Sequence, residues 1–206
     1  MQNERTGRTG PVAGVVLAAG TSTRMGENKL LFELDGESVV RRAVSRASAA
    51  GLDPVIVVLG HEADRVRREL SGLPCRCVVN PDYAGGINGS LKTGIAAIPA
   101  DTAATVVLLA DMPFVTAGML TTLVERYRAG RAPLVISDYE GVNAPPMLYD
   151  RTLFAELLVM EGEGCGKQVV RRHRAAADVA QWPAAALTDL DVPDDYDRVR
   201  SLLAAG

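Results

Sequence analysis

Hydrophobic and polar positions follow two alternating patterns along this chain. Short apolar runs predict buried strands, and apolar residues that recur every three or four positions predict helices. The predicted strands are Val12–Ala19, Pro54–Leu59, Arg76–Val79, Ala104–Ala110, Leu134–Tyr139 and Pro146–Tyr149. The predicted helices are Ser38–Ala50, Glu62–Leu70, Ser90–Ile98, Thr116–Ala129, Arg151–Met160, Lys167–His173 and Asp194–Leu203. Strands that alternate with helices predict a Rossmann-like α/β fold in three layers, with a doubly wound, mostly parallel sheet covered on both faces.

Two polar stretches of this pattern occur where a ligand site is expected. Ligands of doubly wound sheets bind beyond the carboxyl ends of the strands. The stretch from Gly20 to Lys29 follows the first predicted strand, and Asp111 directly follows the most apolar one. We therefore expect these two stretches to meet at one edge of the sheet.

The length and charge of the chain limit its class. We expect the 206 residues to form one domain from residue 12 to residue 206, after a polar, disordered tail over residues 1–11. The start has no signal-peptide pattern, and no apolar stretch approaches the roughly 18 residues that span a membrane. The formal charge of −3 gives no basic surface for nucleic acid or an anionic membrane. A protein without either partner is expected.

The cysteine content favours a reducing compartment. The chain has three cysteines, Cys75, Cys77 and Cys165, and this sparse, odd set is typical of reduced thiols in the cytoplasm. Cys75 and Cys77 lie on one side of a predicted strand, as a metal-binding pair or as small apolar side chains. With only two histidines and no second cysteine pair, the apolar interpretation is favoured.

The stretch after the first strand has the composition of a phosphate-binding loop. Gly20 and Gly26 allow the backbone to approach a ligand closely, while Arg24 and Lys29 add positive charge. Its spacing matches neither the Walker A motif nor the dinucleotide fingerprint, in which Ser22 would have to be glycine. Phosphate binding is favoured over a plain turn with incidental charges.

The same stretch resembles a family signature. Residues 17–29 match L-A-A-G-x-S-x-R-M-G-x-x-K of the nucleotidyltransferases, in the branch of the molybdenum cofactor cytidylyltransferases and the molybdopterin guanylyltransferases. The resemblance implies that this loop wraps a nucleoside triphosphate, and that Arg24 and Lys29 act in catalysis by balancing charge on the departing pyrophosphate. The nucleotide-binding residues that it implies here are Leu17, Ala18, Ala19, Gly20, Thr21, Ser22, Arg24, Met25, Gly26 and Lys29.

Three later stretches resemble the same family in order and spacing. Residues 86–94 are similar to G-x-x-x-S-L-x-x-G, which implies that Gly86 and Ser90 face the nucleobase. Residues 108–115 resemble L-x-x-D-x-P-F-V, which implies a catalytic metal ligand at Asp111. Residues 189–196 are similar to D-x-D-T-P-E-D-Y, which implies a second metal ligand at Asp191, with Asp189 as its competitor. Taken without the resemblance, these aspartates also suit helix caps.

The resemblance implies a nucleotidyltransferase fold and a Mg²⁺-dependent reaction. The phosphate of an acceptor attacks the α-phosphorus of a nucleoside triphosphate and releases pyrophosphate. Residues 12–115 would form the nucleotide-binding half and residues 116–206 the acceptor-binding half. The acceptor implied is the molybdenum cofactor, with a molybdoenzyme as recipient. Ala19 favours CTP, since the guanylyl branch that this turn resembles has glycine at this position.

Departures from the family pattern leave alternatives open. The acceptor half has Gly141-Val142-Asn143-Ala144-Pro145 where this branch often has Gly-His-Pro, and Met112 replaces a glutamine common in the cytidylyl branch. The alternatives are a guanylyl- or other nucleotidylyltransferase with a different phosphorylated acceptor, and a non-catalytic pterin cofactor-binding delivery protein. An NAD-dependent oxidoreductase is disfavoured by the broken glycine fingerprint.

Overall fold

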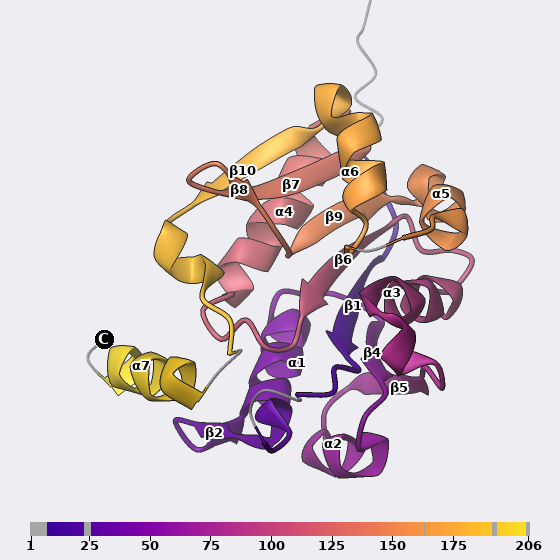
Figure 1. The fold of residues 1–206 in the computed structure, drawn as a ribbon. Helices are drawn as coiled ribbons and strands as arrows, with labels where there is room; N and C mark the ends of the chain where they lie inside the picture. The colour runs from indigo at the N-terminus through magenta and orange to yellow at the C-terminus, as the bar shows by residue number, and fades with distance from the viewer. Residues whose placement is uncertain (1–7, 23–25, 163, 191–192, 205–206) are drawn as a thin grey trace, which may run out of the picture.

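The computed structural model describes residues 8–22, 26–162, 164–190 and 193–204. These residues form a layered α/β domain with a central sheet of eight strands (Figure 1). The sheet has the order β10-β7-β9-β6-β1-β4-β5, with β8 paired to β7. The strands are β1 Val12–Ala18, β4 Val55–Leu59, β5 Cys75–Val79, β6 Ala104–Leu109, β7 Leu134–Tyr139, β8 Val142–Asn143, β9 Met147–Asp150 and β10 Asp178–Trp182.

Helices cover both faces of this sheet, as a doubly wound fold requires. One hydrophobic cluster joins one face to α1, α2 and α4, and a second joins the other face to α3, α5 and α6. The helices are α1 Val39–Ala49, α2 Ala63–Glu69, α3 Ile87–Ala96, α4 Ala117–Ala129, α5 Phe154–Val159, α6 Lys167–His173 and α7 Pro193–Ala204. The predicted fold class is therefore confirmed, and no helix among the described residues is both long and apolar enough to cross a bilayer.

The directions of the central strands determine which edge of the sheet carries the loop after β1 and Asp111. β1 pairs in parallel with β4 and β6, so the carboxyl ends of these three strands lie at one edge. Every residue of β1 and β4 is buried, because helices cover both faces, and this is why the sequence shows them as continuous apolar runs. β9 is antiparallel to β6 and to β7, which makes the sheet mixed.

Two strand segments differ from the expectation. β10 lies between the predicted helices Lys167–His173 and Asp194–Leu203, where the sequence pattern predicts no strand. It pairs in parallel with β7, and only Ala180 of its five residues is buried, so its hydrophobic pattern is weak. The residues Glu33–Leu34 and Glu37–Ser38 form a hairpin of β2 and β3, and Asp35 and Gly36 in its turn have positive φ.

The chain ends contact this domain at two places. Arg8 donates from Nη2 to the carbonyl of Arg131 at 2.9 Å, and its guanidinium lies 4.4 Å from the ring centroid of Tyr127. Residues 8–11 thus contact the domain, while residues 1–7 of the expected tail lie outside the described residues. At the other end, Tyr196 of α7 donates to the carbonyl of Glu33 at 2.7 Å, which links α7 to the β2–β3 hairpin.

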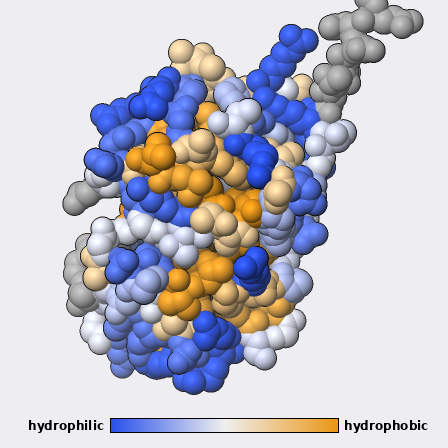
Figure 2. Space-filling model, turned by 90° about the vertical axis from the view of Figure 1, so that its right-hand side faces the viewer, coloured by the Kyte–Doolittle hydropathy of each residue, from blue (hydrophilic) through white to orange (hydrophobic). Residues whose placement is uncertain are grey.

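Hydrophobic side chains also reach the surface. Figure 2 shows hydrophobic residues gathered in the middle of the face turned to the viewer, the right-hand side of Figure 1, where α3 and α5 lie. Leu158 and Val159 of α5 are among the exposed large hydrophobic residues.

The three cysteines are free thiols, and Cys75 and Cys77 pack partly against the larger core cluster, as the apolar interpretation predicts. Burial raises the pKa of the Cys75 thiol to about 11.

The close packing of α3 on the sheet leads to a stability prediction. A Cβ at Gly94 would lie 2.5 Å from Cγ1 of Val15 in β1 and 3.0 Å from Cγ2 of Val58 in β4. We expect Gly94→Ala to lower the free energy of unfolding by about 1–3 kcal/mol, because the helix must move outward. The matched control is Gly118→Ala in α4, where the nearest atom is 3.7 Å away. Urea unfolding should show no loss for this control, and equal stability of the two variants would contradict the close-packing argument.

Candidate active site

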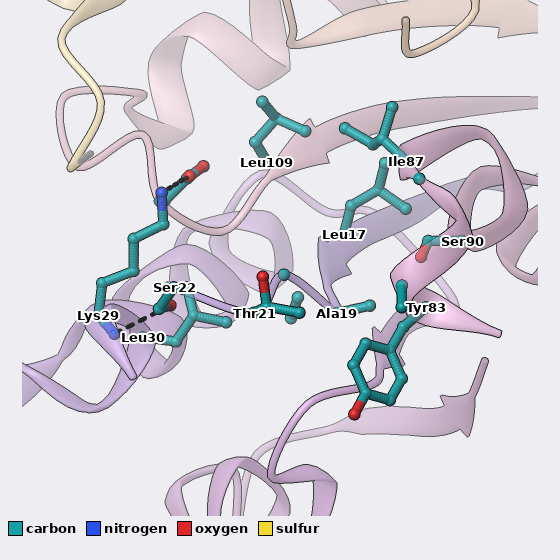
Figure 3. Close-up of a pocket in the computed structure, with 15 residues that line it drawn as sticks. Leu17, Ala19, Thr21, Ser22, Lys29, Leu30, Tyr83, Ile87, Ser90 and Leu109 are labelled. Atoms are coloured by element: carbon teal, nitrogen blue, oxygen red, sulfur yellow. Dashed lines mark hydrogen bonds and ion pairs between the residues drawn. The ribbon is translucent and has the colours of Figure 1, made fainter. Parts of the chain in front are cut away.

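A pocket of about 300 Å³ lies at the carboxyl ends of β1 and β6, beside the first turn of α3. It brings together predicted site residues of three separate stretches, the loop after β1, the start of α3 and Asp111 (Figure 3). The lining residues are Leu17, Ala18, Ala19, Gly20, Thr21, Ser22, Lys29, Leu30, Tyr83, Ala84, Gly86, Ile87, Ser90, Leu109 and Asp111. The expectation that residues 17–29 meet Asp111 at the edge of the sheet therefore holds for the described residues.

The loop after β1 folds back toward the pocket. Ser22 has a left-handed backbone with φ of 51°, and its hydroxyl accepts a hydrogen bond from the amide of Lys29 at 3.2 Å. The Asn28 side chain accepts from the amide of Leu30 at 3.2 Å and so caps the 3-10 turn over Lys29–Leu31. These bonds direct the lysine stem into the site. Gly26, with φ of 75°, lines a neighbouring polar pocket that also includes Thr21 and Ser22.

Several predicted residues of this loop cannot be placed. Arg24 and Met25 lie outside the described residues, as does Asp191. Their predicted roles stay predictions.

The charged end of the pocket is an ion pair. Lys29 Nζ lies 2.6 Å from Oδ2 of Asp111, and the two side chains are only 12% and 19% exposed. Low exposure strengthens the attraction, because less water screens the two charges. Figure 3 shows Lys29 extended across the site toward this carboxylate. The pair joins the loop after β1 to the end of β6.

The Asp111 segment is held from two sides. The Arg46 guanidinium of α1 donates to the carbonyls of Pro113 and Val115, the latter at 2.7 Å. Burial, with a smaller contribution from Arg42, lowers the pKa of Arg46 to about 10, so the group stays charged at neutral pH. From the other side, the amide of Leu190 donates to the carbonyl of Asp111 at 3.2 Å.

The contact of Leu190 with Asp111 brings the residues that precede Asp191, the second predicted metal ligand, close to Asp111. Asp189, the competitor of Asp191, is described and exposed. No group of three or more metal-ligating side chains occurs among the described residues. A cation at this place would therefore draw on few carboxylates.

The opposite end of the pocket is largely apolar. Figure 3 shows Leu17, Ile87 and Leu109 above Ala19, with Ser90 and Tyr83 on the far side from Lys29. α3 starts at Ile87 rather than at the expected Ser90, because Gly86 in the preceding turn has φ of 105°. Ser90 thereby lies in the first turn, 4% exposed.

Gly60, at the end of β4, allows this end of the pocket to form. A Cβ at position 60 would lie 2.5 Å from Cβ of Tyr83 and 2.8 Å from Cβ of Ala19. The backbone carbonyl of Ala19 would be equally close, at 2.7 Å. Only glycine leaves room for both pocket residues to pack on this strand end.

Several residues of the site could not be identified from the sequence, because they belong to no motif or periodic pattern. Tyr83 borders the pocket from the turn before α3 and Ile87 from the first position of that helix, and one aromatic and one apolar residue there show no periodicity. Arg46 is one of several arginines on α1, and its carbonyl partners are 67 and 69 positions away in the chain. The predicted glycine and serine motif of α3 identifies this region only in outline.

A family model decides the class of the protein. The model of the MobA-like NTP transferase domain matches residues 14–179, which include the loop after β1, the first turn of α3 and Asp111. The chain belongs to this family. The recognised nucleotidyltransferase resemblance is thereby confirmed, and the protein is an NTP transferase with the corresponding α/β fold.

Individual relatives of this MobA-like transferase cover most of the chain. The purine catabolism protein PucB of Bacillus subtilis (strain 168) is 29% identical over 207 residues, which are 93% of this chain and 97% of PucB. The bifunctional protein GlmU of Kineococcus radiotolerans is 34% identical over 147 residues, 69% of this chain but only 30% of GlmU.

Solved structures agree. The crystal structure of Rv0371c from Mycobacterium tuberculosis H37Rv has a TM-score of 0.79 and 27% identity, and covers 93% of this chain and 98% of that one. A structure of Rv0371C in complex with manganese has a TM-score of 0.74 and 25% identity, with 94% and 99% covered.

Proposed function

We propose that this transferase moves a nucleoside monophosphate, CMP in preference, from its triphosphate to the phosphate of an acceptor. An acceptor oxygen forms a bond to the α-phosphorus, the bond from that phosphorus to the bridging oxygen breaks, and pyrophosphate leaves. The acceptor that we propose is the molybdenum cofactor in the cytoplasm, with a molybdoenzyme as the recipient of the product.

The observation that carries this proposal is the polarity of the pocket. The Lys29–Asp111 pair lies at one end, and Ala19, Ser90 and Tyr83 lie at the other. A triphosphate with its phosphates toward the pair and its base toward Ser90 would meet a charged group and an apolar wall in the matching order. A protein catalyses nucleotidyl transfer mainly by positioning the two substrates and by balancing the charge on their phosphates.

The residues present suit a divalent cation. Mg²⁺ prefers one or two carboxylates together with phosphate oxygens, and Asp111 is a partly exposed carboxylate on the pocket wall. We propose Asp111 and Asp191 as the protein ligands, with Asp189 as the alternative to Asp191. When bound, the cation would neutralise charge on the phosphates. The manganese complex of the mycobacterial relative supports a divalent metal in this family.

The chain's own groups have separate roles in this proposal. Lys29 leaves Asp111 for the β- and γ-phosphates and balances the charge that grows on pyrophosphate, together with Arg24. Backbone N–H groups of the loop around Gly20 and Thr21 bind the phosphates. The acceptor phosphate is already an anion, so no side chain has to remove a proton from it.

One experiment tests the reaction class. The protein is incubated with Mg²⁺, each of the four nucleoside triphosphates and a panel of phosphorylated acceptors that includes the molybdenum cofactor, and pyrophosphate release is followed. We expect release that needs triphosphate, acceptor and metal together. Tight binding of the cofactor without release under any combination would instead favour the delivery protein.

The choice of nucleobase gives a separate prediction. We expect CTP to exceed GTP by at least about tenfold in kcat/KM, because the Ala19 methyl narrows the base end of the pocket against the larger purine. Ala19→Gly should narrow this gap. Competition assays with equal CTP and GTP measure both, and a preference of the unchanged protein for GTP would show that the steric argument is wrong.

A different acceptor is the second candidate. The stretch that often carries a histidine in the cytidylyl branch has Asn143, whose side-chain amide donates to Oδ2 of the buried Asp138 at 2.7 Å. Asn143 is thus engaged within the sheet and supplies no imidazole. A guanylyl- or other nucleotidylyl transfer to another phosphorylated acceptor, such as a sugar phosphate, would appear as activity in the other arms of the acceptor panel.

A further inference from the structure

Asn80 is a buried polar residue beside the base end of the pocket that the function proposed above does not use. It directly follows β5, and its backbone amide donates to the carbonyl of Leu59 at 2.8 Å, which extends the pairing of β5 with β4. The residue is 4% exposed. Its side-chain amide lies against the first turn of α3, where a Cβ on Gly89 would come within 3.4 Å of Nδ2.

Both ends of the Asn80 amide have partners, and these fix its orientation. Oδ1 accepts from the backbone amide of Asp82 at 3.1 Å, and Nδ2 donates to Oγ of Ser90 at 3.0 Å. The reversed amide would place its NH₂ group against the N–H of Asp82, which cannot accept a hydrogen bond. The backbone at Asp82 therefore forces Nδ2 to face Ser90.

This contact determines what the Ser90 hydroxyl can offer to a ligand. A hydroxyl has one hydrogen and two lone pairs, and Asn80 occupies a lone pair. Within the described parts of the chain no acceptor takes the hydrogen. Thr93, one turn further on, does donate to the carbonyl of Gly89 at 3.0 Å, but Ser90 forms no comparable bond. Since Ser90 lines the pocket, its hydrogen is left for whatever binds there.

We infer that Asn80 is a positioning residue that makes Ser90 a hydrogen-bond donor toward an acceptor atom on the nucleobase edge. This inference rests on the proposed function and adds the polarity of base recognition. A ring carbonyl or an unprotonated ring nitrogen fits such a donor, whereas an exocyclic amine would meet only the remaining lone pair of the hydroxyl. Because Ser90 is almost fully buried, a base that presents only an amine here would leave the serine hydrogen without an acceptor.

Asn80→Asp tests the inference because it reverses the bond without changing the shape of the side chain. One carboxylate oxygen still accepts from Asp82, but the other must now accept from Ser90, which turns the serine lone pairs toward the base. At pH 8, where an introduced carboxyl group is ionised, we expect affinity for the preferred nucleotide to fall at least about tenfold. Ser90→Ala, which removes the donor without presenting a lone pair to the base, should cost less, about three- to tenfold.

The control is the same substitution in a chain without the hydroxyl. In the Ser90→Ala background, Asn80→Asp should cost less than about a further threefold, because no hydroxyl is left to reverse. This comparison separates polarity from the added charge and from any general damage, since both are present in the two backgrounds. Thermal unfolding of all four proteins reports folding. Asn80→Ala replaces Asn80→Asp should the latter not fold, with an expected loss of about two- to fivefold that also disappears without the hydroxyl.

Equilibrium dialysis with Mg²⁺ and each of the four nucleoside triphosphates measures these affinities without an acceptor. A loss of nucleotide affinity on Asn80→Asp when Ser90 is present, and little further loss when Ser90 is replaced by alanine, would support the inference. Equal losses in both backgrounds would overturn it and leave the proposed function standing. Absence of nucleotide binding by the unchanged protein would overturn the proposed function and this inference together.

Discussion

Asp111→Asn should lose nearly all pyrophosphate release, a fall of about 1,000-fold or more in kcat. The amide keeps the size of the side chain but cannot supply the negative charge that holds a cation on the phosphates. Charge stabilisation by a bound metal is worth several kcal/mol, and each 1.4 kcal/mol is about tenfold in rate. Initial rates at saturating triphosphate and acceptor measure the effect.

The fold should survive this change. Asp111 contributes an ion pair with Lys29 rather than core volume, so we expect the unfolding midpoint to move by only a few degrees. Asp64→Asn is the matched control, because Asp64 lies on the surface of α2, where its partner is Arg67 at 2.8 Å. Near-normal release by Asp111→Asn, or an equal loss in the control, would rule out the metal role.

Lys29→Met should lower kcat by about 100- to 1,000-fold while changing triphosphate affinity much less. A cation that acts on charge developing on the departing pyrophosphate stabilises the transition state more than the bound substrate. The same direction is expected for Arg24→Ala. Steady-state kinetics that separate kcat from KM test this prediction.

The control for Lys29 is another lysine near the pocket. Lys92 belongs to α3 but is not among the lining residues, so Lys92→Met should leave both constants close to those of the unchanged protein. A variant of Lys29 in which only KM rises would mean that the lysine binds the ground state alone.

The central strands and the position of the loop after β1 are the parts that the sequence predicts well. β1 and β4 are buried throughout and β6 nearly so, and each therefore appears as an apolar run, interrupted in β6 only by Thr105. The loop after β1 has several residue types at fixed spacing, and this spacing matches the signature of the family to which the chain belongs. Both features are local, so they are legible without the fold.

The parts that escaped prediction depend on partners far away in the chain. β10 is an edge strand held by backbone pairing with β7, and only one of its residues is buried, so its side chains show little periodicity. The sequence predicts that the loop after β1 and Asp111 meet at one edge of the sheet, but it does not predict the ion pair between Lys29 and Asp111, because nothing in either stretch selects the partner atom. Asn80 becomes meaningful only when β5 brings it beside α3.

The packing around Gly60 limits how the shape of the pocket can be redesigned. Of the three parallel strand ends at this edge of the sheet, the end of β4 offers no position for a side chain, because Ala19 and Tyr83 already occupy that space. Variation in this end of the pocket is therefore confined to the ends of β1 and β6 and to the turn before α3. Most substitutions at position 60 would displace Ala19 and Tyr83 from their present positions. Paired substitutions at positions 19 and 83 would instead alter the width of the pocket and leave the end of β4 unchanged.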